Sequence, residues 1–151
     1  GMTVLYNKRT RYSEAEERER GITYAEKDEV IRRADVLSLH TPLTPETRHL
    51  IGARELAMMK PTAILINTAR GAVVDEPALV AALKDGRIAA AGLDVFEQND
   101  VPSPELFELE NVSLTPHIGT QTYDSRVEMV HELCNNVIGF LRGDRKIDRV
   151  N

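Results

Sequence analysis

Short apolar segments that do not alternate with polar residues constrain the fold of this chain most. Three of them are VLSL at 36–39, AILIN at 63–67 and AAAGL at 89–93. Strands of this kind are buried on both faces, which is typical of parallel sheets that helices cover on each side. Helical patterns separate the segments, so the sequence predicts a doubly wound α/β fold.

Capping signals set the limits of the predicted helices. Ser13 and Glu16 form a capping-box pattern, and Gly21 follows the helix that they begin. Asp75 is placed to cap a helix that runs to Lys84. The predicted strands lie at 3–6, 22–24, 36–39, 63–67, 88–95 and 111–115, and the predicted helices at 13–20, 26–33, 53–60, 76–84 and 121–142. There is no internal repeat and no interdomain linker.

Composition excludes several classes of protein. The chain has 151 residues, 42% of them hydrophobic and 28% charged, which is typical of one globular domain with its own core. Its net charge of −5 opposes a broad nucleic-acid interface. The single cysteine and the lack of a membrane-spanning apolar segment favour a reducing, cytoplasmic setting. Cys134 lies at helical spacing among valines and leucines, so we expect a buried thiol rather than a nucleophile.

Polar side chains follow four of the predicted strands directly. Ligands of parallel sheets bind beyond the carboxyl ends of the strands, so these residues are expected to share one edge. Each has a structural interpretation as well: a surface arginine, an aspartate that satisfies backbone donors, or a structural histidine. Their common placement favours a functional site. The segments concerned are His40–Pro42, Thr68–Gly71, Asp94 and Pro116–Gly119.

Several long motifs, in a consistent order, resemble one family. "HTPLTPETRHLI", "INTARGAVVDEPALVAALKDGRIAAAGLDVFE" and "LFELENVSLTPHIG" are similar to motifs of the D-isomer-specific 2-hydroxyacid dehydrogenases. The resemblance covers the chain to about Arg142. It implies a Rossmann-like NAD(P)-binding domain and an oxidoreductase that interconverts a 2-oxo acid and a D-2-hydroxy acid. Lys8, Arg9 and the sequence "PHIGTQT" resemble the glyoxylate or hydroxypyruvate reductases.

The resemblance assigns a role to each motif residue. Arg70 matches the arginine that binds the substrate carboxylate, and a guanidinium suits that bidentate task. His117 matches the acid/base histidine, a side chain that exchanges protons near neutral pH. Asp94 matches the residue that holds the nicotinamide carboxamide. The positions that line the cofactor cleft are Thr41, Pro42, Thr68, Ala69 and Gly119. No metal site is implied.

Position 99 departs from the family pattern. Most members carry a glutamate five residues after the Asp94 position, and its charge favours the protonated histidine. This chain has Asn99, which can orient the ring of His117 but carries no charge. The formate dehydrogenase branch has a glutamine here, so an amide is compatible with hydride transfer. Altered pH dependence or weakened activity is therefore expected, unless Glu97 or Asp100 takes over.

The cofactor is predicted from the first strand. NAD-specific sites place an acid at the end of this strand, whereas NADP sites place cations there for the 2′-phosphate. This strand is followed by Lys8, Arg9 and Arg11, with no acid before Ser13. NADP is therefore favoured over NAD, although clustered surface bases are also a common solvated feature.

The Gly-x-Gly-x-x-Gly turn that cradles the pyrophosphate does not occur in this sequence. "GMTVLY" corresponds to the second strand of the family's domain, so we expect residues 1–151 to be a partial dinucleotide-binding domain without its first strand. In the strand order 3-2-1-4-5-6 that strand is central, and its absence leaves two unpaired edges. The helix at about 121–142 is expected to pack on this domain or to lead back to an absent substrate domain, and the full-length form is expected to be a homodimer.

Two other functions stay open. The C-terminal-binding-protein corepressors share this fold and use nucleotide binding for assembly, so a nucleotide-binding interaction protein is one alternative. The other is an inactive fragment of an enzyme. Arg70, Asp94 and His117 favour the enzyme, whereas Asn99 and the missing glycine-rich turn favour the alternatives. His40 is a candidate for the cleft edge, and His49 and His131 are expected to be ordinary surface or packing residues.

Overall fold

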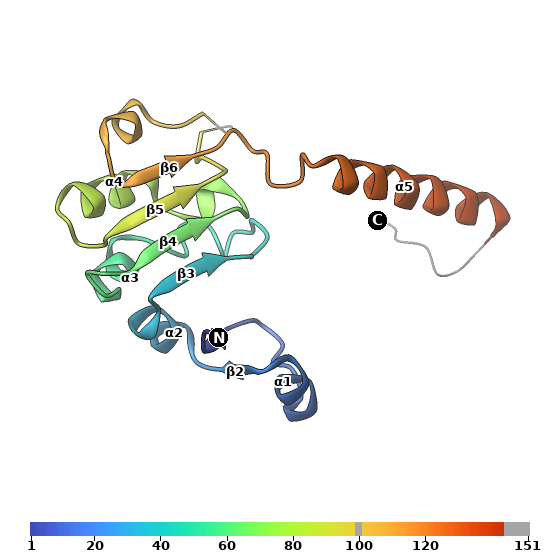
Figure 1. The fold of residues 1–151 in the computed structure, drawn as a ribbon, viewed down its shortest axis with the longest axis horizontal. Helices are drawn as coiled ribbons and strands as arrows, with labels where there is room; N and C mark the ends of the chain where they lie inside the picture. The colour runs from blue at the N-terminus through green and yellow to red at the C-terminus, as the bar shows by residue number, and fades with distance from the viewer. Residues whose placement is uncertain (99–100, 144–151) are drawn as a thin grey trace. The chain divides into compact units, whose positions relative to one another are not determined.

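The structure, a computed structural model, describes residues 1–98 and 101–143 of the chain (Figure 1). Its elements alternate between strands and helices, as the sequence predicts. In chain order they are β1 (Val4–Tyr6), α1 (Glu14–Arg20), β2 (Ile22–Tyr24), α2 (Lys27–Arg33), β3 (Val36–Leu39), α3 (Ala53–Met58), β4 (Ile64–Asn67), the 3₁₀ helix η1 (Gly71–Val73), α4 (Glu76–Lys84), β5 (Ala90–Leu93), the 3₁₀ helix η2 (Pro104–Glu108), β6 (Val112–Leu114) and α5 (Tyr123–Arg142). The two 3₁₀ helices were not predicted.

The chain divides into two units. The first extends from Gly1 to Pro116 and contains every strand found in the described residues. The second begins at His117, and its described part consists of a short turn and α5.

The main sheet has four parallel strands in the order β3-β4-β5-β6. Its register places Leu39, Asn67, Leu93 and Leu114 in one row across the carboxyl ends of the strands. The residues that directly follow this row therefore lie at one edge of the sheet. This confirms the predicted grouping for the members that belong to the first unit.

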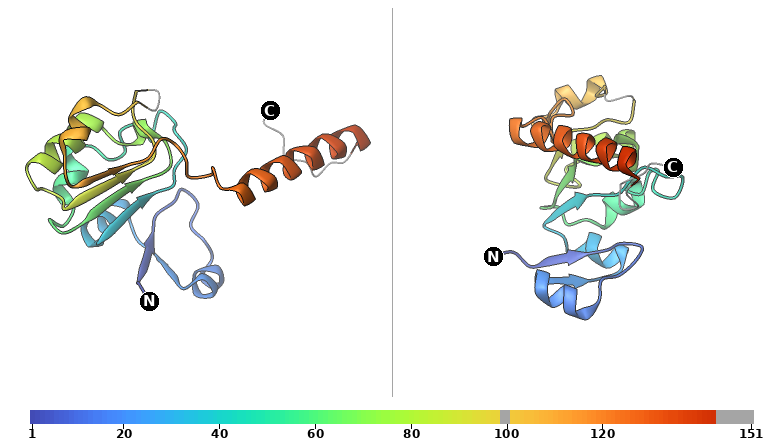
Figure 2. Two further views of the ribbon diagram at one scale, coloured as in Figure 1. Left: turned by 45° about the horizontal axis from the view of Figure 1, so that its top comes forward. Right: turned by 90° about the vertical axis from the view of Figure 1, so that its right-hand side faces the viewer.

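Helices cover one face of the main sheet. α2, α3 and α4 lie in a row against it (Figure 2), and the inward residues of the strands, Leu37, Leu65 and Leu93 among them, are buried there. The opposite face is more open within this unit, since Val36 is 52% exposed and Ile64 36%. The α/β class is confirmed, whereas helices within the first unit cover mainly one face rather than both.

β1 and β2 form a separate two-stranded parallel sheet. In the described residues no strand joins β1 to β3, which agrees with the expected sheet that is open in its middle. The small sheet is stabilised by a polar cluster. Tyr6 donates a hydrogen bond from Oη to Oε1 of Glu17 at 2.7 Å, and Arg11 pairs with both oxygens of Glu17 at 2.7 and 3.0 Å.

The capping predictions are confirmed. Ser13 and Glu16 form the reciprocal capping box of α1, and Gly21 ends that helix at φ +64°, in the left-handed region where glycine is not strained. Asp75 Oδ1 accepts a hydrogen bond from the amide of Ala78 at 3.0 Å and so caps α4.

Glu17→Gln is expected to destabilise the β1–α1–β2 part of the chain at neutral pH but not near pH 2. The hydrogen bond from Arg11, followed by that from Tyr6, lowers the pKa of Glu17 from 4.5 to about 2. A group whose pKa is lowered on folding contributes stability above its unfolded pKa and loses it as the pH falls through the folded value. The stability difference between wild type and variant should therefore shrink from pH 5 to pH 2, in urea unfolding monitored by amide exchange.

Glu19→Gln is the matched control for this prediction, because Glu19 lies exposed on the same helix. It should leave stability nearly unchanged at every pH. A Glu17→Gln variant whose stability loss is the same at pH 3 and pH 7 would contradict the predicted linkage.

The second unit corrects one prediction. Cys134 is exposed rather than buried, and its apolar neighbours on α5 are exposed too, with Val130 at 56% and Leu141 at 78%. The helical spacing was correct, since α5 runs through all of them. No other described element of the second unit packs over this stripe, so periodicity alone did not produce burial. Among the described residues, none of the helices is long and apolar enough to span a membrane.

Candidate functional site

The turn after β4 is held by a buried amide. Asn67 is 1% exposed and ends β4. Its Nδ2 donates to the carbonyl oxygen of Arg70 at 3.0 Å, and its Oδ1 accepts from the amide of Ala69 at 3.1 Å. Thr68 and Arg70 are exposed on this turn. The buried side chain of Asn67 thus holds the backbone at Arg70 in place. The guanidinium of Arg70 lies at the surface and donates to the carbonyl of Ala69 at 2.7 Å.

The residue after Arg70 is Gly71, and the space at this position has no room for a side chain. A Cβ at this position would lie 1.8 Å from the carbonyl oxygen of Phe96 and 2.6 Å from the amide nitrogen of Glu97. The backbone at Gly71 therefore packs directly against the segment that follows β5. This close approach explains why the arginine is followed by glycine.

Asp94 directly follows β5 and is 5% exposed. Thr115 donates a hydrogen bond from Oγ1 to Oδ1 of Asp94 at 2.5 Å, and the amide of Asp94 donates to the carbonyl of Asn67 at 3.0 Å. The ends of β4, β5 and β6 are therefore linked at this point.

The segment after β3 contributes an unsatisfied hydroxyl. Thr41 Oγ1 is buried and has no hydrogen-bond partner among the described residues. The carbonyl of Pro42 accepts from Thr47 Oγ1 at 2.6 Å, and the exposed His40 contacts Ser38 Oγ through Nε2 at 2.8 Å. A buried hydroxyl without a partner is costly unless a ligand or water satisfies it. The buried hydroxyl of Thr41 therefore fits a polar ligand group or a water, whereas the sequence holds no glycine-rich cradle for a dinucleotide pyrophosphate.

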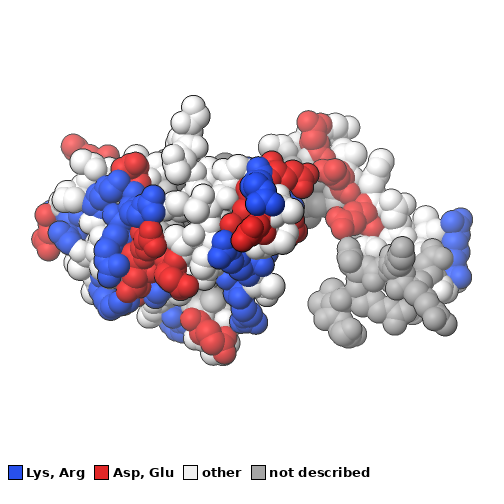
Figure 3. Space-filling model, turned by 90° about the horizontal axis from the view of Figure 1, so that it is seen from below, with Lys and Arg blue, Asp and Glu red and all other residues white. Residues whose placement is uncertain are grey.

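The basic residues after β1 separate into two kinds. Arg11 is committed to the Glu17 carboxylate and lies 5.1 Å from the ring centroid of Tyr24. Lys8 lies 3.8 Å above the ring of Tyr12, and Arg9 is exposed. Basic and acidic side chains are interleaved on the face that Figure 3 shows. Of the three predicted cations, Lys8 and Arg9 remain candidates for binding a phosphate.

His117 and Gly119 lie in the turn that opens the second unit. His117 has φ +54°, a left-handed conformation that is uncommon for a residue with a Cβ. The turn is closed by a hydrogen bond from the amide of Gln121 to the carbonyl of Ile118 at 2.9 Å. Asn99 lies outside the described residues.

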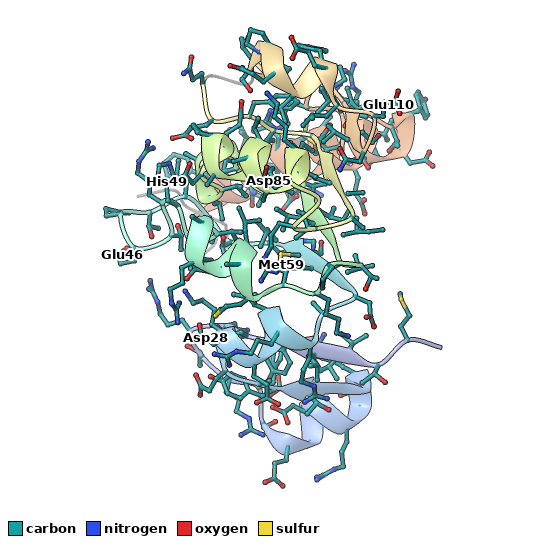
Figure 4. All side chains as sticks on the ribbon, turned by 90° about the vertical axis from the view of Figure 1, so that its left-hand side faces the viewer. Asp28, Glu46, His49, Met59, Asp85 and Glu110 are labelled. Atoms are coloured by element: carbon teal, nitrogen blue, oxygen red, sulfur yellow. The ribbon has the colours of Figure 1, made fainter. Side chains whose placement is uncertain are left out.

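One cluster was missed from the sequence. Glu97 Oε1 contacts His49 Nε2 at 2.6 Å and accepts from Arg48 Nη2 at 2.8 Å. Figure 4 shows His49 on the loop that precedes α3. His49 is exposed, in agreement with its interpretation as a surface or packing residue, but its contact with Glu97 was not predicted. Nearly fifty residues separate the partners, so no local pattern could have paired them.

Comparisons with known proteins show the family of the chain. Residues 1–119 match the family model described as "D-isomer specific 2-hydroxyacid dehydrogenase, NAD binding domain". The glyoxylate reductase of Thermococcus litoralis is 51% identical over 151 residues, which is 100% of this chain and 45% of that protein. Glyoxylate/hydroxypyruvate reductase B of Enterobacter agglomerans is 49% identical over 152 aligned residues, 100% of this chain and 47% of the relative.

Solved structures give the same result. The NAD-complexed D-isomer specific 2-hydroxyacid dehydrogenase of Lactobacillus delbrueckii ssp. bulgaricus matches with a TM-score of 0.87 and 36% identity, over 99% of this chain and 48% of that one. A glyoxylate reductase from Paecilomyes thermophila matches with a TM-score of 0.86 and 42% identity, over 92% of this chain and 42% of the other. The chain spans less than half the length of these relatives. It belongs to the D-isomer-specific 2-hydroxyacid dehydrogenase family, and the part it shares with that family is the NAD-binding domain.

Proposed function

We propose that this chain is the nucleotide-binding part of an NAD(P)-dependent reductase that converts a small 2-oxo acid, of the glyoxylate or hydroxypyruvate class, into its D-2-hydroxy acid. The observation that carries the proposal is the edge of the main sheet. There the Arg70 turn, fixed by Asn67, lies one strand away from the buried carboxylate of Asp94. The names of the relatives support the substrate class.

The proposed roles follow from the chemistry of each side chain. The Arg70 guanidinium binds the substrate carboxylate through two charge-assisted hydrogen bonds. Asp94 accepts a hydrogen bond from the nicotinamide carboxamide, while Thr41, Pro42, Thr68, Ala69 and Gly119 line the cofactor cleft. When bound, a reduced nicotinamide would supply a hydride to C2 of the substrate. His117 would donate a proton to the oxygen on that carbon, which stays attached as the hydroxyl of the product.

Lys8 and Arg9 are proposed to favour NADP over NAD. Arg9 is exposed beside the end of β1, where no acid precedes Ser13 to bind a ribose diol. Arg11 is excluded from this role because its guanidinium is paired with Glu17. The phosphate would therefore meet two cations rather than three.

The test is oxidation of NADPH and NADH by the complete natural polypeptide that contains these residues, with glyoxylate, hydroxypyruvate and pyruvate as substrates. We expect turnover with at least one of the first two and a lower Kd for NADPH. A lower Kd for NADH would contradict the cofactor proposal. Tight nucleotide binding without turnover would favour a nucleotide-binding interaction protein, an alternative that Asn99 supports, and loss of both would favour an inactive fragment.

Asn99→Glu is expected to raise reductase activity at alkaline pH. A carboxylate at this position would stabilise the protonated form of His117, and so keep a proton available where the amide cannot. The measurement is kcat for glyoxylate reduction from pH 6 to pH 10. An unchanged profile would show that another carboxylate already performs this task, and Asn99→Gln, which keeps the amide, is the control.

A further inference from the structure

The buried Glu76 and the half-buried Glu97 exchange hydrogen bonds with each other's backbone. The amide of Glu97 donates to Oε2 of Glu76 at 3.0 Å, and the amide of Glu76 donates to Oε2 of Glu97 at 3.3 Å. The second oxygen of Glu76 accepts from the amide of Ser103 at 2.9 Å. The side chain of Glu76 therefore binds two amides of the segment that follows β5, those of Glu97 and Ser103.

The second oxygen of Glu97 is also occupied. It contacts His49 Nε2 at 2.6 Å and Arg48 Nη2 at 2.8 Å. His49 adopts φ +52° in this position, a conformation that costs free energy in a residue with a Cβ. Burial raises the pKa of Glu97, but the hydrogen bonds from His49 and the Glu76 amide and the charges of His49 and Arg48 outweigh this, so its pKa is lowered. Glu97 is thus ionised at neutral pH.

Packing alone does not explain such a cluster. Removing carboxylates from water, wholly for Glu76 and partly for Glu97, costs free energy, and apolar side chains of similar volume would often stabilise a protein as well or better. Directional hydrogen bonds, by contrast, fix the positions of the groups that they join. The cluster is therefore better suited to holding segments in register than to raising overall stability.

The segment that Glu76 and Glu97 hold directly follows Arg70. Gly71 packs on the peptide between Phe96 and Glu97, where even a Cβ would not fit. From Gly71 the chain passes through η1 to Glu76, which binds back to Glu97. The stretch 71–76 is therefore attached to the stretch 96–97 at both of its ends, and a displacement at Glu97 would be transmitted to the turn that bears Arg70.

We propose that Glu76 and Glu97 are positioning residues that hold the Arg70–Gly71 turn in the geometry required to bind a substrate carboxylate. The proposal rests on the proposed function for its catalytic consequence, though not for the structural link. Neither glutamate needs to touch substrate or cofactor. Their effect should appear in the binding of the 2-oxo acid and not in the binding of nucleotide.

Glu76→Gln is the test variant, because glutamine keeps the shape but has one acceptor oxygen for two amide donors. In the complete polypeptide we expect KM for glyoxylate to rise about tenfold, the cost of roughly one hydrogen bond, with the Kd of NADPH changed less than twofold. Glu97→Gln should shift KM in the same direction, and it keeps the proposal testable if the first variant does not fold.

Glu55→Gln is the matched control. Glu55 is buried like Glu76, and like Glu97 it binds a backbone amide and two basic side chains. It lies at the start of α3, away from the Arg70–Gly71 turn. It should reduce thermal stability without raising KM. Equal KM changes in Glu55→Gln and Glu76→Gln would overturn the positioning role and leave only a structural one.

Amide hydrogen exchange separates this proposal from the proposed function. Glu76→Gln should accelerate exchange in peptides that cover residues 69–75, and Glu55→Gln should not. Unchanged exchange at 69–75 overturns the proposal even if the enzyme is active. Accelerated exchange in a polypeptide whose wild type reduces no 2-oxo acid would support the link between the glutamates and the turn, and overturn the proposed function alone.

Discussion

His117→Gln is expected to lower kcat for glyoxylate reduction by about 10²- to 10⁴-fold, the usual contribution of a general acid. Glutamine can donate a hydrogen bond to the substrate oxygen but cannot give up a proton, so the alkoxide that forms at C2 would stay unprotonated. Binding of NADPH should change little, because the imidazole is proposed to serve the substrate. The measurements are steady-state kinetics and a fluorescence titration of NADPH, on the complete natural polypeptide.

The control for His117 is His131→Gln. His131 lies in the same unit, exposed on α5, and matches no motif. Its replacement should change kcat less than twofold. If His117→Gln retains more than a third of the wild-type kcat at neutral pH, another group supplies the proton, and the proposed acid is wrong.

The strand ends were the most predictable part of this molecule. A parallel register is set by the alignment of neighbouring strands, so residues such as Asn67 and Leu93 fall in one row, and the residues after them share an edge. Local capping chemistry was equally predictable, because Ser13 and Glu16 interact within a single helical turn. Both depend on spacings of a few residues.

Contacts between distant segments were not predictable. The pairing of Glu97 with His49 depends on how the loop before α3 meets the segment after β5. The pairing of Arg11 with Glu17 occupies one of the three cations that the sequence offered for binding a phosphate. The exposure of Cys134 has a different cause. Helical periodicity shows which residues share a face of α5, but burial requires a covering surface, and periodicity carries no information about one.

Arg70→Ala is expected to lower kcat/KM for glyoxylate by about 10²- to 10³-fold, since two hydrogen bonds between charged groups would be lost. Most of the effect should appear in KM. Arg70→Lys should recover part of the loss, because an ammonium supplies the charge without the bidentate geometry. Neither variant should unfold the domain, as the side chain is exposed and Asn67 holds the turn through the Arg70 carbonyl.

The control for Arg70 is Arg87→Ala. Arg87 is exposed just before β5, at the opposite edge of the same sheet, so its loss removes an equal charge from the domain without touching the proposed site. If long-range attraction of anionic substrates were the main effect, the two variants would lose similar activity, and both losses would fade with added salt. A loss confined to Arg70, and largely retained at high salt, would instead require direct contact between its guanidinium and the substrate carboxylate.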